Sequence, residues 1–173
     1  MQKHGIALVP ESRKTEGLLL NNTIKFNTTL AVLDRFIKNL VVNTRKEDEI
    51  TEDGIEKLHI KTPSSLVNCS TLSGGNQQKL VLSREVDKDP DLILACQPVR
   101  GLDIGAIKFI HNVLLELRNQ GKAVLLISAE LSDLFQLSDR IGVLYKGEMM
   151  SLQETEKYTT ESISLLMAGK KGV

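Results

Sequence analysis

Two short apolar runs, with a helical pattern between them, constrain most strongly what this chain can fold into. DLILAC (residues 91–96) and KAVLLIS (residues 122–128) each contain a continuous run of five apolar residues, which is typical of strands covered on both faces. The intervening GAIKFIHNVLLELRNQ (residues 105–120) is amphipathic, and Gly121 is placed to end a helix there. Its apolar face consists of Ile107, Ile110, Leu114 and Leu117. Strand, helix and strand in succession require a crossover connection, so we expect an α/β fold with a parallel sheet.

The remaining segments predict further elements around this unit. GIALVPE (residues 5–11) indicates a short buried strand that ends at Pro10, and SRKTEGLLLNNT after it is a polar loop. A helix capped by Asn22 or Thr23 is expected to run through Ile24, Leu30, Leu33 and Ile37. Residues 46–56 form a solvated helix, and RIGVLYKGEMMSL gives two strands around the turn at residues 146–148. A last helix begins at Thr160 or Ser162.

Composition excludes several classes of function. The chain has 22 basic and 22 acidic residues in 173, so its net charge does not favour a nucleic-acid surface, and no nucleic-acid partner is expected. No apolar run approaches the roughly 18 residues that cross a bilayer, so any membrane role would act through a partner. Cys69 and Cys96 lack the spacing of a metal site and are interpreted as free thiols.

The stretch LSGGNQQK (Leu72–Lys79) combines a serine, two adjacent glycines and the start of a helical pattern. The hydroxyl of Ser73 and the N–H groups of Gly74, Gly75 and Asn76 would gather at a helix N-terminus, where partial positive charge favours a phosphate. Without side chains, the two glycines would admit an anion onto the backbone. The alternative is a tight turn capped by Ser73 with no ligand.

In its order of motifs, the chain resembles the ATP-binding-cassette ATPases. LSGGNQQK resembles their signature motif, DLILACQPVRGLD their catalytic strand and D-loop, and AVLLISAELSDLFQLSDRIGVLYKGEM the following strand, switch loop and final strands. IALVPESRKTEGLLL, GNQQK and the closing LLMAG resemble the second cassette in the fused ATP-binding subunits of bacterial monosaccharide and nucleoside importers. The resemblance implies a P-loop NTPase (RecA-like) core with a parallel sheet, plus an α-helical subdomain that carries the signature.

The phosphate-binding motif G-x-x-x-x-G-K-[ST] is absent from the sequence. In the family, that loop and the first strands precede the segment that GIALVPE resembles, so the chain is expected to correspond to the C-terminal part of a cassette. On this basis residues 1–20 are the strand and Q-loop region of the core. Residues 21–88 are the helical subdomain, and residues 89–173 are the C-terminal half of the core.

Four positions depart from the family pattern. Cys96 stands where the Mg²⁺-binding aspartate is expected, and Gln97 stands where the catalytic glutamate is expected. Ala129 replaces the switch histidine, and Glu11 replaces the Q-loop glutamine. A thiol is a poor ligand for Mg²⁺, and glutamine cannot accept a proton from water. We therefore expect no confident catalytic residue, no metal ligand and no ATP hydrolysis by this half-site alone.

The intact signature predicts a role in trans. In the family two cassettes pair head to tail, and the signature of one contacts ATP held by the P-loop of the other. The resemblance assigns that contact to Ser73, Gly74, Gly75, Asn76 and Gln77. It assigns the dimer seam to Gly101, Leu102 and Asp103, with Arg100 a candidate for an ion pair there. It assigns coupling to the membrane subunits to Glu11, Arg13 and Lys14.

The implied cofactor is ATP with Mg²⁺, bound mainly by the partner cassette. The implied partners are that cassette, transmembrane permease subunits and, indirectly, a substrate-binding protein, at the cytoplasmic face of the bacterial inner membrane. The competing hypothesis is a non-hydrolytic regulatory or dimerisation module. A cassette of DNA repair or translation shares the signature, but VPESRK and GNQQK argue against it. The transported solute is left open.

Overall fold

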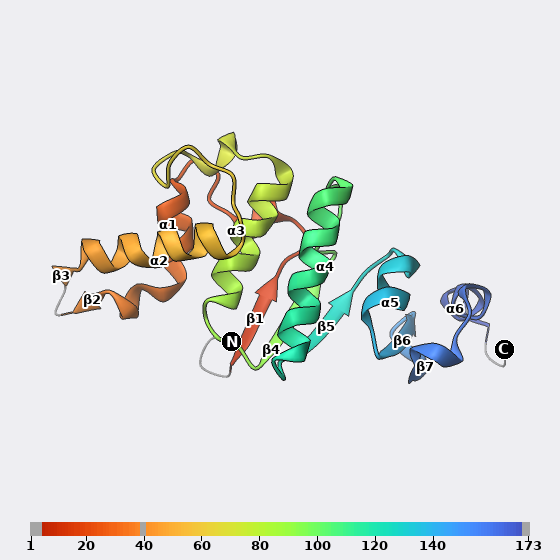
Figure 1. The fold of residues 1–173 in the computed structure, drawn as a ribbon. Helices are drawn as coiled ribbons and strands as arrows, with labels where there is room; N and C mark the ends of the chain where they lie inside the picture. Colours follow the sequence, from red (N-terminus) through yellow and green to blue (C-terminus); the bar gives the residue numbers. More distant parts are fainter. Residues whose placement is uncertain (1–4, 39–40, 171–173) are drawn as a thin grey trace. The chain divides into compact units, whose positions relative to one another are not determined.

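Three parallel strands form the sheet that the apolar runs predict (Figure 1). The computed structural model describes residues 5–38 and 41–170 and contains β1 (Ile6–Val9), β4 (Leu92–Cys96) and β5 (Ala123–Ile127) in the order β1-β4-β5. Ile93 lies opposite Ala7 on one side and Val124 on the other. The predicted parallel α/β sheet is therefore confirmed, with the crossover from β4 to β5 made by α4 (Ile104–Asn119).

Among the described residues of the first unit, helices cover one face of this sheet. The helices α3 (Gly74–Val86) and α4 both pack on the face that carries Ala7, Val9, Ile93 and Ala95, which are at most 2% exposed. On the opposite face, Leu125 and Ile127 are 53% and 51% exposed. The prediction that KAVLLIS is buried on both faces is therefore wrong for the described residues, because both packing helices lie on the same side.

The segment after β1 differs from the predicted polar loop and single helix. A π-helical turn spans Arg13–Gly17, capped by Ser12, and α1 (Ile24–Thr29) follows, capped by Thr23. The predicted continuation of α1 to Ile37 is wrong, since a 3-10 segment begins at Leu30 and Ile37 lies in β2 (Ile37–Lys38). The hydroxyls of Thr28 and Thr29 bind backbone carbonyls four residues back, which bends and weakens a helix.

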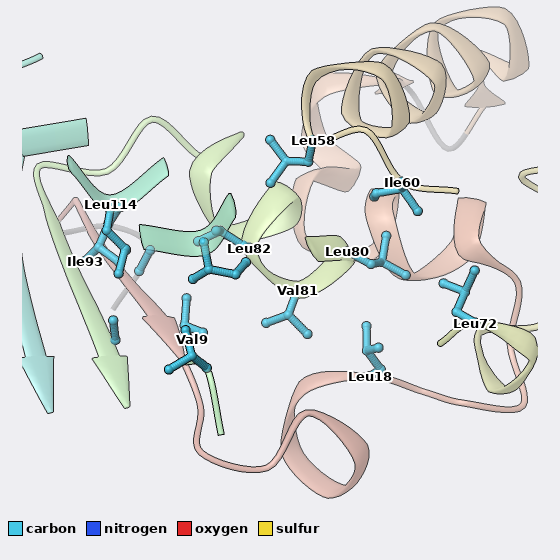
Figure 2. Close-up of a cluster of buried hydrophobic side chains, with 14 of the residues drawn as sticks. Val9, Leu18, Leu58, Ile60, Leu72, Leu80, Val81, Leu82, Ile93 and Leu114 are labelled. Atoms are coloured by element: carbon cyan, nitrogen blue, oxygen red, sulfur yellow. The ribbon is translucent and has the colours of Figure 1, made fainter. Parts of the chain in front are cut away.

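The helical part of the first unit is assembled around α3. β2 pairs with β3 (Val41–Val42), and α2 (Thr44–Lys57) packs with α1 and α3; the predicted solvated helix is confirmed, although Thr51 and Gly54 are buried. Figure 2 shows Leu80 directed toward Ile60 and Leu72, whereas Leu82 lies on the side of Ile93. Burial on several sides of α3 therefore fixes the position of the signature at its N-terminus.

The second compact unit, Ser128–Val173, has its own small core. The predicted hairpin is confirmed as β6 (Arg140–Tyr145) and β7 (Glu148–Glu154), joined by Lys146 and Gly147 with φ of 49° and 85°. The helices are α5 (Leu131–Leu137) and α6 (Thr160–Met167), the latter capped by Thr159. The first unit is Met1–Ile127, so the boundary falls inside the predicted segment 89–173.

Candidate functional site: the N-terminus of α3

The N-terminus of α3 is organised by hydrogen bonds from the signature itself. The Ser73 hydroxyl oxygen accepts from the backbone N–H of Asn76 at 3.4 Å and from its side-chain Nδ2 at 3.1 Å. Asn76 Oδ1 in turn accepts from the backbone N–H of Lys61 at 3.0 Å. Asn76 therefore fixes the cap and ties it to the chain that follows α2, while the hydroxyl proton of Ser73 is available to donate.

This helix end has the properties of an anion-binding surface. The first N–H groups of an α-helix have no intrahelical acceptor, and the helix dipole adds partial positive charge there. Of these groups, the N–H of Asn76 is bound by Ser73. Ser73 is exposed and Gly74 is partly exposed, whereas Gly75 is buried. The geometry thus confirms the predicted helix start, with the exposed Ser73 and the partly exposed Gly74 at this helix end.

Each glycine of the pair also has a close neighbour within the chain. A Cβ added to Gly74 would lie 2.8 Å from Nη2 of Arg13. A Cβ added to Gly75 would lie 2.9 Å from Cβ of Ala106 and 3.5 Å from Oδ2 of Asp103. Packing against Ala106 disfavours any side chain at position 75, and at position 74 a Cβ would displace the flexible end of Arg13, so the glycine pair does not by itself demonstrate a nucleotide. No sequence pattern predicts these partners, because they are distant along the chain.

Gln77 is a buried residue of α3. Its side chain is 4% exposed, and Nε2 donates to the carbonyl oxygen of Cys69 at 3.1 Å. Its Oε1 is buried without a hydrogen-bond partner among the described residues. In this conformation Gln77 is an interior residue, and the accessible part of the predicted contact is limited to Ser73, Gly74 and Asn76.

The segment after β4, residues 97–103, contains the predicted catalytic position and the predicted dimer seam. Gln97 has a φ of 48°, an unfavourable value for a residue with a Cβ, and its N–H donates to the carbonyl oxygen of Ile127 at 2.7 Å. Such strain is characteristic of functional positions. Cys96 is partly buried rather than fully buried as expected.

The three seam residues have distinct local roles. Gly101 has a φ of +68° and Leu102 is partly buried. Asp103 is the N-cap of α4, with Oδ1 accepting from the N–H of Ala106 at 2.9 Å. The signature and the start of α4 are thus adjacent, since Gly75 contacts the same first turn of α4.

The loop after β1 meets the segment after β4. The carboxylate of Glu11 forms an ion pair with the guanidinium of Arg100, and Nη1 of Arg13 donates to the carbonyl oxygen of Arg100 at 3.1 Å. The acidic partner predicted for Arg100 is therefore Glu11 of the same chain. Lys14 is exposed. Two of the three predicted coupling residues, Glu11 and Arg13, therefore join the signature and the seam in one region.

Ala129, at the predicted position of the switch histidine, is an exposed residue of the second unit. Within residues 5–38 and 41–170, no three His, Cys, Asp or Glu side chains are grouped so as to hold a metal ion. Over the same residues, no helix combines the length and the apolar character needed to cross a membrane.

Two titratable groups near α3 have shifted pKa values that the sequence did not predict. Nζ of Lys79 lies 3.8 Å from the centroid of the Phe109 ring and donates to the carbonyl oxygen of His59 at 3.1 Å. Burial, reinforced by Lys61, lowers the pKa of Lys79. On the interior side, burial raises the pKa of Cys69 to about 11. Both groups stabilise the position of α3 rather than present chemistry at its N-terminus.

Comparison with known proteins identifies the class. The fold matches an inward-facing conformation of a putative metal-chelate type ABC transporter with a TM-score of 0.76 and 17% identity, over 95% of this chain and 64% of that one. It matches a post-hydrolysis dimer of the ATP-binding cassette MJ0796 bound to ADP and phosphate with a TM-score of 0.70 and 21% identity, over 88% and 64%. The fold is that of ATP-binding-cassette ATPase domains, a P-loop NTPase fold.

The curated relatives in sequence belong to a narrower class, the ATP-binding proteins of importers. The chain is 39% identical over 170 residues to the guanosine import ATP-binding protein NupO of Bacillus subtilis and 37% identical over 169 residues to the nucleoside import ATP-binding protein NupA of Lactococcus lactis. It is 38% identical over 163 residues to the galactose/methyl galactoside import ATP-binding protein MglA of Clostridium tetani. These alignments cover 94% to 96% of this chain but only 32% to 33% of each relative.

The chain thus spans about one third of the length of these curated relatives. Its homologues are ATP-binding proteins of sugar and nucleoside importers, which confirms the resemblance stated from the motifs. No model of a protein family matches the chain.

Proposed function

We propose that this chain acts within the ATP-binding subunit of an importer for simple sugars or nucleosides, where its signature completes an ATP site on a second cassette. The observation that carries the proposal is the accessible N-terminus of α3, with the hydroxyl of Ser73 beside the N–H of Gly74. Homology to import ATP-binding proteins supports it. So does the likeness to a cassette that was determined as a dimer bound to ADP and phosphate.

The residues present fit the phosphates of ATP but not its metal ion. N–H groups and a hydroxyl at a helix N-terminus suit a phosphate group. The thiol of Cys96 does not suit Mg²⁺, which prefers hard oxygen ligands. Bound ATP would supply the phosphoryl group to be transferred, with Mg²⁺ and the P-loop contributed mainly by the partner cassette. The role of this chain is to donate hydrogen bonds from Ser73 and the α3 backbone.

The chain's own catalytic positions do not support hydrolysis. Gln97 can orient a water molecule but cannot accept its proton, and Ala129 provides no imidazole for a γ-phosphate. Electrostatic stabilisation supplies most of the catalysis in phosphoryl transfer. This half-site is therefore a degenerate one, and ATP turnover would occur at the composite site formed with the partner.

The proposed assembly places this chain at the cytoplasmic face of a bacterial inner membrane. A second cassette would pair with it head to tail through the signature and the seam at Gly101, Leu102 and Asp103. Permease subunits would contact the loop that carries Glu11, Arg13 and Lys14, and a substrate-binding protein would take part indirectly. The divisions at residues 20 and 88 would separate the first part of the core, the helical subdomain and the rest of the core.

The proposal is tested with two variants of Ser73 in an importer assembled from this chain, its partner cassette and its permease. Ser73→Ala removes the hydroxyl, and we expect ATP turnover to fall about a hundredfold, the typical loss for one transition-state donor. Ser73→Asp keeps a good N-cap but places negative charge against the phosphate, so it is expected to fold normally and to abolish turnover. Ser70→Ala, an exposed serine three residues earlier, is the matched control and should retain turnover.

The non-hydrolytic module remains the second candidate, because the glycine pair is already explained by contacts within the chain. It predicts that Ser73→Asp leaves the turnover of the assembly unchanged. Turnover that is insensitive to Ser73→Asp would therefore refute the catalytic role in trans and favour the regulatory or dimerisation role. The isolated chain is expected to show no measurable ATP hydrolysis under either hypothesis.

A further inference from the structure

Three segments that are far apart in the sequence meet around the guanidinium of Arg13. Nη1 donates to the carbonyl oxygen of Arg100, 87 positions away, at 3.1 Å. The same group lies against Gly74, where an added Cβ would be 2.8 Å from Nη2, 3.5 Å from Cζ and 3.8 Å from Nε. Arg13 therefore contacts both the first residue of α3 and the segment that leads to the cap of α4.

The position of this guanidinium is an unfavourable one in isolation. A cation next to a helix N-terminus faces partial charge of its own sign. In addition, Nε of Arg13 is buried and has no acceptor among the described residues. The hydrogen bond from Nη1 to the carbonyl oxygen of Arg100 compensates in part. The ion pair between Glu11 and Arg100 joins the same two loops a second time.

We propose that Arg13 is a positioning residue that fixes residues 97–103 relative to the signature, and that position 74 is glycine because the guanidinium occupies the place of its side chain. The signature and the cap of α4 would then be presented to a partner as one unit. This last consequence rests on the function proposed above, whereas the coupling between Arg13, Gly74 and Arg100 does not.

The geometry predicts how Gly74→Ala would act. The atom that the new Cβ meets is the far end of a flexible side chain, so Arg13 would swing away instead of α3 moving. Arg13 would then lose its hydrogen bond to Arg100. Gly74→Ala and Arg13→Ala therefore remove the same contact, and their effects should not add when the two are combined.

The test is amide hydrogen exchange in the full chain, measured at Arg100 and Leu102. Their N–H groups donate to the carbonyls of Gln97 at 3.1 Å and Val99 at 3.2 Å, and these turns depend on how firmly the segment is held. Arg13→Ala and Gly74→Ala are each expected to accelerate exchange about five- to tenfold, the factor that corresponds to one lost hydrogen bond. The double variant should match either single variant.

Arg45→Ala is the matched control, since Arg45 is a 90% exposed arginine in α2 that pairs only locally with Glu49. It should leave exchange at both amides unchanged. Unaltered exchange in Arg13→Ala, or accelerations that multiply in the double variant, would overturn the proposal.

A second measurement uses the assembled importer. Arg13→Ala is expected to lower kcat about tenfold with little change in the KM for ATP, because a misplaced segment impairs geometry rather than nucleotide binding. Arg45→Ala should change neither. An unchanged kcat in an assembly that does respond to Ser73→Asp would overturn the positioning role. An assembly insensitive to Ser73→Asp would instead refute the proposed function, and the exchange result would still decide whether Arg13 couples the segments.

Discussion

The contact between Gly75 and the first turn of α4 gives the sharpest stability prediction. In Gly75→Ala the new Cβ would lie 2.9 Å from Cβ of Ala106, whereas ordinary contacts begin at 3.4 Å. The helices α3 and α4 would have to separate by about 0.5 Å, and neither atom belongs to a flexible side-chain end. Overpacking of this kind costs about 1–3 kcal/mol. The higher helix propensity of alanine compared with glycine offsets up to about 1 kcal/mol of this cost.

The expected net loss is about 1–2 kcal/mol, which corresponds to a fall in Tm of about 3–6 °C for a chain of this size. Urea unfolding followed by circular dichroism measures it directly. Adding Ala106→Gly removes the clashing methyl group, so the double variant should be more stable than the sum of the two single changes predicts, by at least about 1 kcal/mol. A Gly75→Ala variant as stable as the parent, or a coupling energy of zero, would refute the reasoning.

Three further predictions follow from other contacts. Burial raises the pKa of Cys69 from an ordinary 9.0 to about 11, so the folded state holds its proton longer, and stability should fall by about 2 kcal/mol as pH rises from 9 to 11. Cys69→Ala should lose that slope in urea titrations. Asp103→Ala removes the cap of α4 and is expected to cost about 1 kcal/mol in unfolding free energy, whereas Asp103→Asn should restore most of it. Glu85 is 4% exposed and binds Arg84 and Lys88, so Glu85→Gln should cost about 2 kcal/mol, seen as a lower urea midpoint, because two cations lose their counter-charge.

Sequence patterns predicted best the features that depend on near neighbours in the chain. The α/β class, the strands β1, β4 and β5, the turn at Lys146 and Gly147, and the start of α3 at Ser73 all follow from residues within a few positions of one another. The prediction of a helix that reaches Ile37 was wrong, because two local effects in this segment oppose each other. Apolar spacing favoured a continuous helix, but the hydroxyls of Thr28 and Thr29 bond to carbonyls within it and Val32 has a non-helical φ of −133°.

For the candidate site, the sequence by itself determined which groups gather at one helix end, because a cap is made by residues three positions apart. That Cys96, Gln97 and Ala129 stand at catalytic positions and lack their chemistry follows from the resemblance and stays a prediction. Only the tertiary structure decided what surrounds the glycines, that Gln77 faces the interior, and that the loops of Glu11 and Arg100 meet. The physical reason is sequence distance: these contacts join residues up to 89 positions apart, and they form only when packing of the sheet and of α3 brings their segments together.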